Sequence, residues 1–208
     1  SNLAIKNNNF EDEICPVTIS SKKGKSTFET DEEPLKFDKN KISMLKPAFS
    51  KDGTITAANA SSLSDGSAAM LIGNDSLLRE SQIQPKAKIV SHSSFATEPI
   101  YFTKAPIYAI QKLLKQTELS ISDIDLFEIN EAFSCVPMIA LDKLNIPKEK
   151  LNVNGGAVSM GHPIGASGAR ILVTLVNALI KRKLKYGIAS ICIGGGEACA
   201  ILIENYNK

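Results

Sequence analysis

The sequence predicts an α/β fold built on a mixed sheet. First, helix-type and strand-type hydrophobic patterns alternate along residues 87–203. Second, two strand-like runs at residues 187–193 and 199–203 are joined by residues 194–197 (Gly-Gly-Gly-Glu), which indicates an antiparallel hairpin at the C-terminal end. Third, hydrophobic residues make up 43% of the 208 residues, which is enough for a sizeable core.

The first 50 residues are expected to lie outside this core. Residues 1–10 are rich in asparagine, and residues 20–26 and 31–41 are charged and poor in large apolar side chains. One strand-like run, residues 15–19, interrupts them, so the region is expected to be a surface excursion with a hairpin.

The elements after the turn at Asp52 and Gly53 follow from local patterns. In chain order they are small residues at 57–62, a buried strand at 68–72, a short helix at 75–81, a strand at 87–92, a helix opening at 104–106 and a strand at 124–129. A long helix at 167–183 has an apolar stripe on one face. Its last residues are basic, which complements the helix dipole.

Charge and hydropathy exclude several function classes. Lys+Arg number 24 and Asp+Glu 22, and a net charge of +2 is too balanced for a nucleic-acid or anionic-membrane partner. No run approaches the roughly 18 apolar residues of a membrane span, and no secretory signal is expected. The four cysteines match no common zinc spacing. They could pair as two disulfides, but a chain of this size can be stable without them, so reduced thiols in an intracellular compartment are expected.

The first candidate site follows the strand at 124–129. Asn130 and Glu131 lie where an apolar strand ends, and ligands of α/β folds bind beyond the carboxyl ends of strands. The amide of Asn130 could hold a water or a carbonyl, and Glu131 could orient a neighbour. The alternative is that the pair caps a helix.

The second candidate site is a glycine-rich stretch around His162. Residues 152–168 contain five glycines and one histidine in 17 positions, directly before the long helix. The stretch has too little apolar mass to bury an imidazole, so His162 is predicted to be catalytic. A phosphate loop is the rival interpretation, but both the Gly-Lys-Ser/Thr and the Gly-x-Gly-x-x-Gly patterns are absent.

The third candidate site is Cys192, which ends a strand and precedes three glycines. Bare backbone amides beside a sulfur can bind an anion and tune a thiol. The alternative is a small buried core residue. The other cysteines (Cys15, Cys135, Cys199) and His92 lack such a setting and are expected to be structural.

An amide, an imidazole and a thiol together suggest two enzyme classes. A papain-like hydrolase needs cysteine, histidine and asparagine in that chain order, whereas here Asn130 comes first and Cys192 last. The remaining class is carbon–carbon bond chemistry on a thioester.

Four motifs resemble those of the thiolase family. They are residues 52–61 with Asp65 and Gly66, residues 130–133 (Asn-Glu-Ala-Phe), residues 152–168 and residues 187–196. Within the family, the residues at 57–59 (Ala-Ala-Asn) and 152–154 (Asn-Val-Asn) are similar to those of acetyl-CoA acetyltransferases of the mitochondrial acetoacetyl-CoA thiolase type.

The resemblance implies a thiolase-like βαβαβαββ half with a mixed five-stranded sheet. Residues 1–50 would be the end of the CoA-binding loop domain, and residues 51–208 the C-terminal thiolase domain. The acylated nucleophilic cysteine of the family lies in the N-terminal half, which has no counterpart here. The missing half is therefore an expected partner, and the isolated chain is expected to be inactive.

The resemblance also implies a reaction: condensation of two acetyl-CoA to acetoacetyl-CoA and CoA, or its reverse. His162 would activate the missing nucleophile, and Asn130 would hold a water that completes an oxyanion hole. Cys192 would be the acid/base for the α-proton, and the Gly194 amide would serve a second oxyanion hole. Such a base needs a tuned pKa, and the enolate needs preorganised donors.

Further implied properties concern substrate, ion, assembly and compartment. Ser61, Phe133 and Ala57 would line the CoA site, and the carbonyls of Ala57, Ala58, Ala60 and Val158 would bind potassium. No covalent cofactor is expected. A homodimer or homotetramer in the mitochondrion or cytoplasm is expected. Glu197 stands where relatives have a smaller or apolar residue.

Two alternatives remain open at this level. A longer-chain 3-ketoacyl-CoA thiolase of β-oxidation would carry the same motifs. A non-catalytic CoA-binding or assembly module is motivated by the absent nucleophile.

Overall fold

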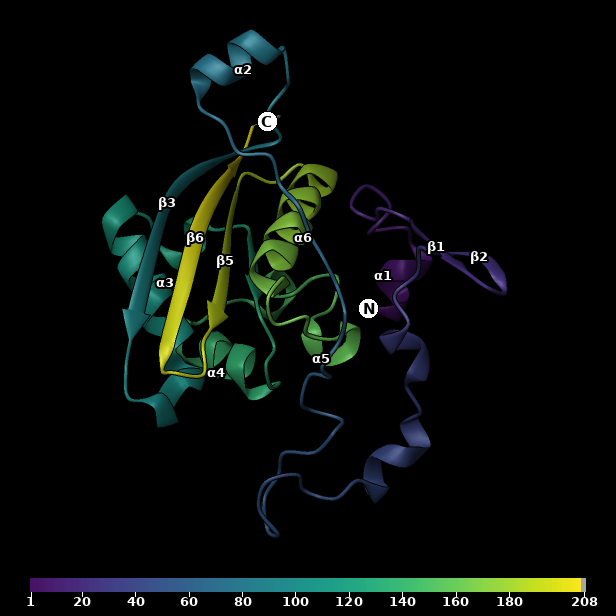
Figure 1. The fold of residues 1–208 in the computed structure, drawn as a ribbon. Helices are drawn as coiled ribbons and strands as arrows, with labels where there is room; N and C mark the ends of the chain where they lie inside the picture. Colours follow the sequence, from purple (N-terminus) through teal and green to yellow (C-terminus); the bar gives the residue numbers. More distant parts are fainter. Residues whose placement is uncertain (207–208) are drawn as a thin grey trace.

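The computed structural model of the chain describes residues 1–206, and its centre is a four-stranded mixed sheet (Figure 1). The strands are β3 (Ala87–Ala96), β4 (Leu126–Ile129), β5 (Tyr186–Cys192) and β6 (Glu197–Asn205). They lie in the order β3-β6-β5-β4, with β6 antiparallel to both neighbours and β4 parallel to β5. The predicted α/β class, mixed sheet and C-terminal hairpin are confirmed.

Helices cover both faces of the sheet. Helices α3 (Ala105–Thr117) and α4 (Cys135–Leu144) pack on one face and α6 (Ser167–Arg182) on the other (Figure 1). The predicted helix at 167–183 is α6, and its stripe of Ile171, Leu175 and Leu179 is buried against the sheet. It ends at Arg182, and the C-cap residue Lys183 takes the left-handed conformation with φ 56°. Helix α4 was not predicted from the sequence.

The expectation of a five-stranded sheet is corrected by the structure, because the central sheet has four strands among the described residues. The fifth position at the β4 edge is occupied by a single parallel bridge between Phe127 and Leu151. The next residue, Asn152, continues the edge with its side chain: Oδ1 accepts from the Ile129 N–H at 2.8 Å, and Nδ2 donates to the Ile129 carbonyl at 2.9 Å. An amide side chain therefore satisfies backbone groups that a longer strand would have paired.

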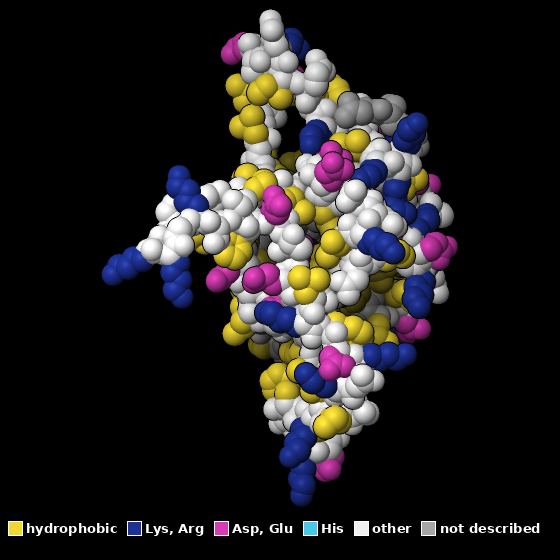
Figure 2. Space-filling model, turned by 90° about the vertical axis from the view of Figure 1, so that its right-hand side faces the viewer, with side chains coloured by type: hydrophobic (Ala, Val, Ile, Leu, Met, Phe, Trp, Pro, Cys, Tyr) yellow, Lys and Arg dark blue, Asp and Glu magenta, His cyan; other side chains and the backbone are white. Residues whose placement is uncertain are grey.

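The predicted buried strand at 68–72 is wrong. The segment forms no strand, and Leu71 and Ile72 are 77% and 67% exposed. Helix α2 (Asp75–Ser81) follows it as predicted, capped by the Asn74 side chain. In Figure 1 this helix stands apart above the sheet. Figure 2 shows hydrophobic side chains exposed on the extended chain that connects it to the rest of the molecule. An apolar run becomes a strand only when a partner strand lies beside it.

The N-terminal part is mostly exposed, with one docked segment. The predicted hairpin forms from β1 (Val17–Ser21) and β2 (Gly24–Phe28), and all ten of its strand residues are exposed. Helix α1 (Asn2–Lys6) and the turn after it bury Ala4 and Phe10, contrary to the expectation that this region lies wholly outside the core.

The remaining elements are short. They are η1 (Glu33–Lys36), η2 (Lys39–Met44), η3 (Pro99–Lys104), η4 (Ile121–Asp123), η5 (Lys148–Lys150) and α5 (Ala157–Met160). In the described part of the chain, no helix has the length and apolar character needed to cross a membrane.

Candidate active site

The predicted site residues gather at the carboxyl ends of two parallel strands. Asn130 directly follows β4, and Cys192 is the last residue of β5. The Asn130 N–H donates to the Ser190 carbonyl at 2.9 Å, which ties the two strand ends together. The capping alternative for Asn130 is wrong, because the next helix, α4, has Ser134 at its N-cap.

His162 is held between Asn130 and Ser167. Its Nε2 lies 3.4 Å from Asn130 Nδ2, and its Nδ1 lies 2.5 Å from the Ser167 hydroxyl. The Ser167 hydroxyl donates to the Pro163 carbonyl at 3.0 Å, so it accepts from Nδ1–H. This assigns the proton to Nδ1 and leaves Nε2 as an acceptor, the arrangement a general base requires.

The loop that carries His162 packs against the small residues 61–65. The His162 N–H donates to the Ser62 carbonyl at 3.0 Å. Gly161 has φ +88°, and a Cβ there would collide with the Ser64 side chain. A cavity of about 310 Å³ opens at this contact, lined by Leu63, Ser64, Asp65, His162 and Ile164.

The electrostatic setting favours a neutral imidazole. Burial lowers the pKa of His162, and the guanidinium of Arg170 lowers it further. His162 is therefore uncharged at neutral pH and able to accept a proton.

Cys192 is a buried thiol rather than an activated thiolate. Its side chain is 8% exposed, and burial raises its pKa to about 11. The glycines that follow do not offset this burial. Within residues 1–206 no hydrogen bond joins Cys192 to His162 or Asn130, so the structure places the three at one edge of the sheet without direct contact. All four cysteines are free, and Cys15 and Cys199 are exposed rather than in the core.

The turn after Cys192 contains Gly194, which is exposed, with no atom within 4 Å of a Cβ built there. Its backbone can be approached closely by a ligand. Glu197 folds back over Gly195, and its buried Oε2 lacks a hydrogen-bond partner among the described residues.

Glu131 secures the glycine-rich loop beside the site. Its carboxylate accepts from the Val158 N–H at 3.0 Å and from Asn152 Nδ2 at 3.2 Å. A Cβ at Gly156 would collide with this carboxylate. The predicted orienting role of Glu131 therefore acts on the loop backbone rather than on Asn130.

Of the predicted CoA-site residues, Ser61 lies beside Phe133. The Phe133 ring packs edge-to-face against Phe49 and Phe102, with centroids 5.8 and 6.3 Å away. Ser61 donates from both its backbone N–H and its hydroxyl to the Ala132 carbonyl. Ala57 lies exposed at the other end of this small-residue run.

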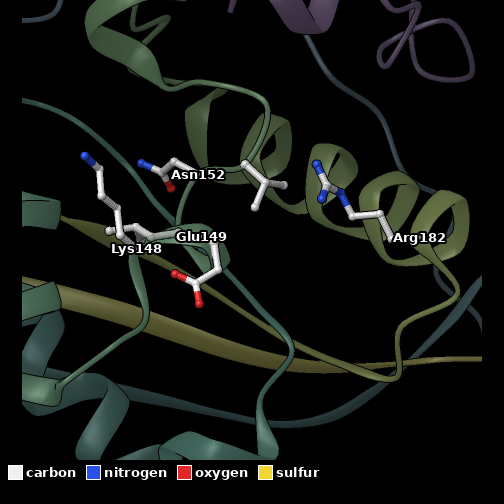
Figure 3. A pocket seen from close by; sticks show the side chains of 6 residues that line it. Lys148, Glu149, Asn152 and Arg182 are labelled. Atoms are coloured by element: carbon white, nitrogen blue, oxygen red, sulfur yellow. The ribbon is translucent and has the colours of Figure 1, made fainter.

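A larger hollow of about 470 Å³ lies elsewhere, between η5 and the end of α6 (Figure 3). Lys148, Glu149, Asn152 and Arg182 line it, and none of the predicted catalytic residues does. Residues 1–206 contain no cluster of three or more His, Cys, Asp or Glu side chains that could hold a metal ion.

The sequence interpretation missed Ser167, which contacts His162, and two further charged residues of this region, Arg170 and Glu128. Ser167 and Arg170 stand three positions apart at the start of a helix, a spacing that places both on one face. A charged residue inside an apolar strand is the signal that could have identified Glu128.

Comparison with known proteins identifies the family. A family model described as "Thiolase, C-terminal domain" matches residues 83–205, and one described as "Thiolase, N-terminal domain" matches residues 1–76. The chain belongs to the thiolase family. The C-terminal match covers all four strands of the central sheet, from Ala87 to Asn205. The strands that position Asn130 and Cys192 therefore belong to the part of the chain that matches the family model.

Individual thiolases support the same conclusion. An acetyl-CoA acetyltransferase of Yarrowia lipolytica is 50% identical over 208 residues, covering 100% of this chain and 52% of the relative. The crystal structure of the Bacillus anthracis acetyl-CoA acetyltransferase superposes with a TM-score of 0.94 at 42% identity, covering 98% of this chain and 52% of that one. Human mitochondrial 3-ketoacyl-CoA thiolase in complex with CoA gives 0.91 at 38% identity, covering 98% and 51%. The chain thus spans about half the length of the thiolases it matches.

Proposed function

We propose that this thiolase chain supplies the acid/base and oxyanion-hole half of an acetyl-CoA C-acetyltransferase. The reaction is the condensation of two acetyl-CoA to acetoacetyl-CoA and CoA, or the reverse thiolysis. The observation that carries the proposal is the Ser167–His162–Asn130 arrangement, in which Nε2 is the acceptor nitrogen of the imidazole, beside the strand that ends in Cys192. The nucleophilic cysteine would come from thiolase N-terminal sequence outside these 208 residues, of which residues 1–76 match only a part.

In the proposed first step, His162 Nε2 takes the proton of that nucleophilic thiol. The thiolate attacks the thioester carbon of the first acetyl-CoA, and the C–S bond to CoA breaks. The leaving CoA thiolate would take the proton of the Cys192 thiol, which leaves Cys192 as a thiolate, while His162 keeps the proton of the nucleophile. A water held by the Asn130 amide and the imidazole would stabilise the oxyanion. The Oδ1 of Asn130 is buried and without a hydrogen-bond partner in the described structure, which is where an ordered water would bind.

In the second step, the Cys192 thiolate would remove the α-proton of the second acetyl-CoA. The resulting carbanion attacks the acyl-enzyme carbonyl, the C–S bond to the nucleophilic cysteine breaks, and that cysteine takes back the proton held by His162. A thiolate whose conjugate acid has a pKa of about 11 is a stronger base than an ordinary one, which suits a weakly acidic α-proton. The exposed backbone at Gly194 is available to donate to the enolate oxygen. In thiolysis, the protonated Cys192 returns the proton.

A potassium ion is part of the proposal through the family resemblance. The donors would be the carbonyls of Ala57, Ala58, Ala60 and Val158. Ala60 bridges to Phe133, and the Val158 N–H donates to Glu131, so both donor segments are tied to the same exit from β4. Carbonyl oxygens are the ligands that hard cations prefer, so the donor set fits in kind. A bound cation would supply positive charge that holds these segments together.

A longer-chain 3-ketoacyl-CoA thiolase is the second candidate, favoured by the 0.91 TM-score with the human 3-ketoacyl enzyme. Rates of thiolysis with acetoacetyl-CoA and 3-ketohexadecanoyl-CoA distinguish the two. A clear preference for the long substrate would contradict the acetyltransferase proposal. A homodimer or homotetramer in lipid or ketone-body metabolism, in the mitochondrion or cytoplasm, is part of the same proposal.

The test is an assay of acetoacetyl-CoA thiolysis, in which the reaction is monitored by the loss of absorbance of the acetoacetyl-CoA enolate. It compares the 208-residue chain, the same chain joined to a thiolase N-terminal half, and Cys192→Ser in each. The joined protein is expected to be active, to lose at least 100-fold with Cys192→Ser, and to keep its activity with Cys199→Ser, a matched change at an exposed cysteine. The chain alone is expected to be inactive.

Each other outcome has a definite meaning. Activity in the isolated chain would place the nucleophile within these residues and contradict the half-site proposal. An inactive joined protein that still binds CoA would favour a CoA-binding or assembly module.

A further inference from the structure

The side chain of Asn152 is bonded to the residues on both sides of Asn130. Its Oδ1 accepts from the Ile129 N–H at 2.8 Å, and its Nδ2 donates to the Ile129 carbonyl at 2.9 Å. The same Nδ2 donates to Glu131 Oε1 at 3.2 Å. One amide group therefore uses its acceptor and its donors on the two neighbours of Asn130.

The peptide unit between Ile129 and Asn130 is bonded at both of its ends. This planar unit contains the Ile129 carbonyl and the Asn130 N–H. Asn152 donates to the carbonyl, and the Ser190 carbonyl accepts from the N–H at 2.9 Å. The plane cannot rotate without breaking one of these bonds, so the direction in which the Asn130 side chain leaves the backbone is set.

The bond to Glu131 fixes the other side of Asn130. Oε1 of this carboxylate accepts from Asn152, and Oε2 accepts from the Val158 N–H at 3.0 Å. Both donors belong to the glycine-rich stretch 152–168 that leads to His162. The residues before and after Asn130 are therefore both bonded to the stretch that carries the histidine.

The contacts of the Asn130 side chain itself are weak. Its Nδ2 lies 3.4 Å from His162 Nε2, which is longer than a typical hydrogen bond. Its Oδ1 is buried and has no hydrogen-bond partner within residues 1–206. The placement of this amide therefore depends on the backbone that carries it more than on bonds made by the side chain.

Asn152 is itself held in place by its backbone. Its N–H donates to the Phe127 carbonyl at 2.8 Å, and its carbonyl accepts from the Gly155 N–H at 2.8 Å. Its φ of 46° lies in the left-handed region, which asparagine adopts more readily than most residues other than glycine. The half-buried side chain is thus aimed at the end of β4 by a bonded backbone.

We propose that Asn152 is a positioning residue of the candidate active site: its side-chain amide sets the orientation of Asn130 by bonding the residues before and after it. The role rests on the proposed function, in which Asn130 holds the water of an oxyanion hole. A donor that is turned away from the developing charge loses its effect, because this kind of stabilisation requires preorganised placement.

Aspartate provides the sharpest test, because it keeps the shape of Asn152 and removes its donors. A carboxylate there would face two acceptors, the Ile129 carbonyl and the Glu131 carboxylate. Asn145→Asp is the matched control, since Asn145 has φ 54° and an exposed side chain. Asn152→Gly is the second variant, because glycine accepts the left-handed backbone and adds no charge.

The first measurement is NMR of the 208-residue chain, which needs no turnover. Both substitutions of Asn152 are expected to shift the side-chain amide signals of Asn130 and to speed hydrogen exchange at the Ile129 backbone amide. Asn145→Asp is expected to change neither. Unchanged Asn130 signals in either folded variant of Asn152 would overturn the proposal.

The unmodified chain gives a result even if both variants fail to fold. The side-chain amide hydrogens of Asn152 are expected to exchange with solvent at least about 10-fold more slowly than those of the exposed Asn145. Equal exchange rates would mean that Nδ2 of Asn152 does not hold the Ile129 carbonyl, and would overturn the proposal.

The second measurement is thiolysis of acetoacetyl-CoA by the chain joined to a thiolase N-terminal half. Asn152→Gly is expected to lower kcat, expressed per mole of folded protein, by about 10-fold or more with little change in KM. Shifted Asn130 signals with an unchanged kcat would overturn the proposal. A joined protein that is inactive before any substitution, with the NMR shifts present, contradicts the proposed function but not the control of Asn130 by Asn152.

Discussion

The sheet unit, residues 87–205, and the segment before it, residues 15–82, are built in different ways. All of the largest fully buried side chains lie between Ile110 and Ile203. In residues 15–82 the buried class contains only Pro34, while Phe49 and Leu71 are 74% and 77% exposed. The sheet unit therefore has its own core, and the earlier segment is held in place by contacts with that unit.

The contacts that hold the earlier segment on the sheet unit are made at the candidate active site. Ser61 binds the Ala132 carbonyl, Ser62 accepts from the His162 N–H, and the Asn59 carbonyl accepts from the Ser134 N–H. The comparison teaches that the core and the candidate catalytic groups lie in one region, while the other forms one side of the candidate site without a core of its own.

The largest effect on the free energy of unfolding is expected from a comparison of two Leu→Ala substitutions, one in each region. Leu175→Ala removes a side chain that is 0% exposed, and we expect it to lower the free energy of unfolding by roughly 3–5 kcal/mol. Leu71→Ala, at a side chain 77% exposed, should change it by less than about 0.5 kcal/mol. Urea denaturation followed by circular dichroism measures both. Equal losses would mean that the two regions share one core.

The second effect concerns pH and the buried Glu128. Its pKa is raised from 4.5 to about 8 in the folded chain, so the folded state holds more protons than the unfolded state between these values. The stabilisation that comes from the protonated Glu128 carboxyl is therefore fully present below pH 4.5 and is lost as the pH rises through about 8. The loss at this carboxyl amounts to a few kcal/mol, since one pKa unit corresponds to about 1.4 kcal/mol.

Glu128→Gln keeps the shape of the neutral acid and removes this loss. We expect the variant to be more stable than the wild type at pH 8.5, with little difference at pH 4.5. Glu80→Gln, on the exposed helix α2, is the matched control and should leave the pH dependence unchanged. Parallel curves for the wild type and Glu128→Gln would show that Glu128 is ionised in the folded chain.

The smallest effect compares two serines that both donate to a backbone carbonyl. Ser167→Ala breaks a fully buried hydrogen bond to Pro163 and the contact with His162, and should cost about 1–3 kcal/mol. Ser21→Ala breaks the exposed hydrogen bond to Gly24 in the hairpin and should cost less than about 0.5 kcal/mol. Thermal unfolding of the two variants provides the measurement, and a larger loss for Ser21→Ala would contradict the contrast.

Much of the sheet unit was predictable from local patterns. The apolar stripe of α6, the hairpin of β5 and β6 and the polar residue at the end of β4 are each encoded within a few neighbouring residues. Helix α4 was missed because its helical pattern is weak: it carries Pro137 in its first turn, and its apolar residues are not confined to one face.

The site was predictable in its residue types but not in its connections. His162, Asn130 and Cys192 are marked by unusual neighbours in the chain. The roles of Ser167 and Arg170 depend on which face of α6 meets the loop, and the depth of Glu128 depends on helices far away in the sequence.

By itself, the sequence determined the α/β class, the order of the main elements and the three chemical groups of the site. Those features depend on side-chain periodicity and turn residues, which act over a few positions. Only the tertiary structure decided that the apolar run at 68–72 stays exposed, that Asn152 completes the sheet edge, and that Glu128 is a neutral acid near Arg170. Strand pairing and burial depend on partners that are distant in the chain, and no local pattern specifies which partner arrives.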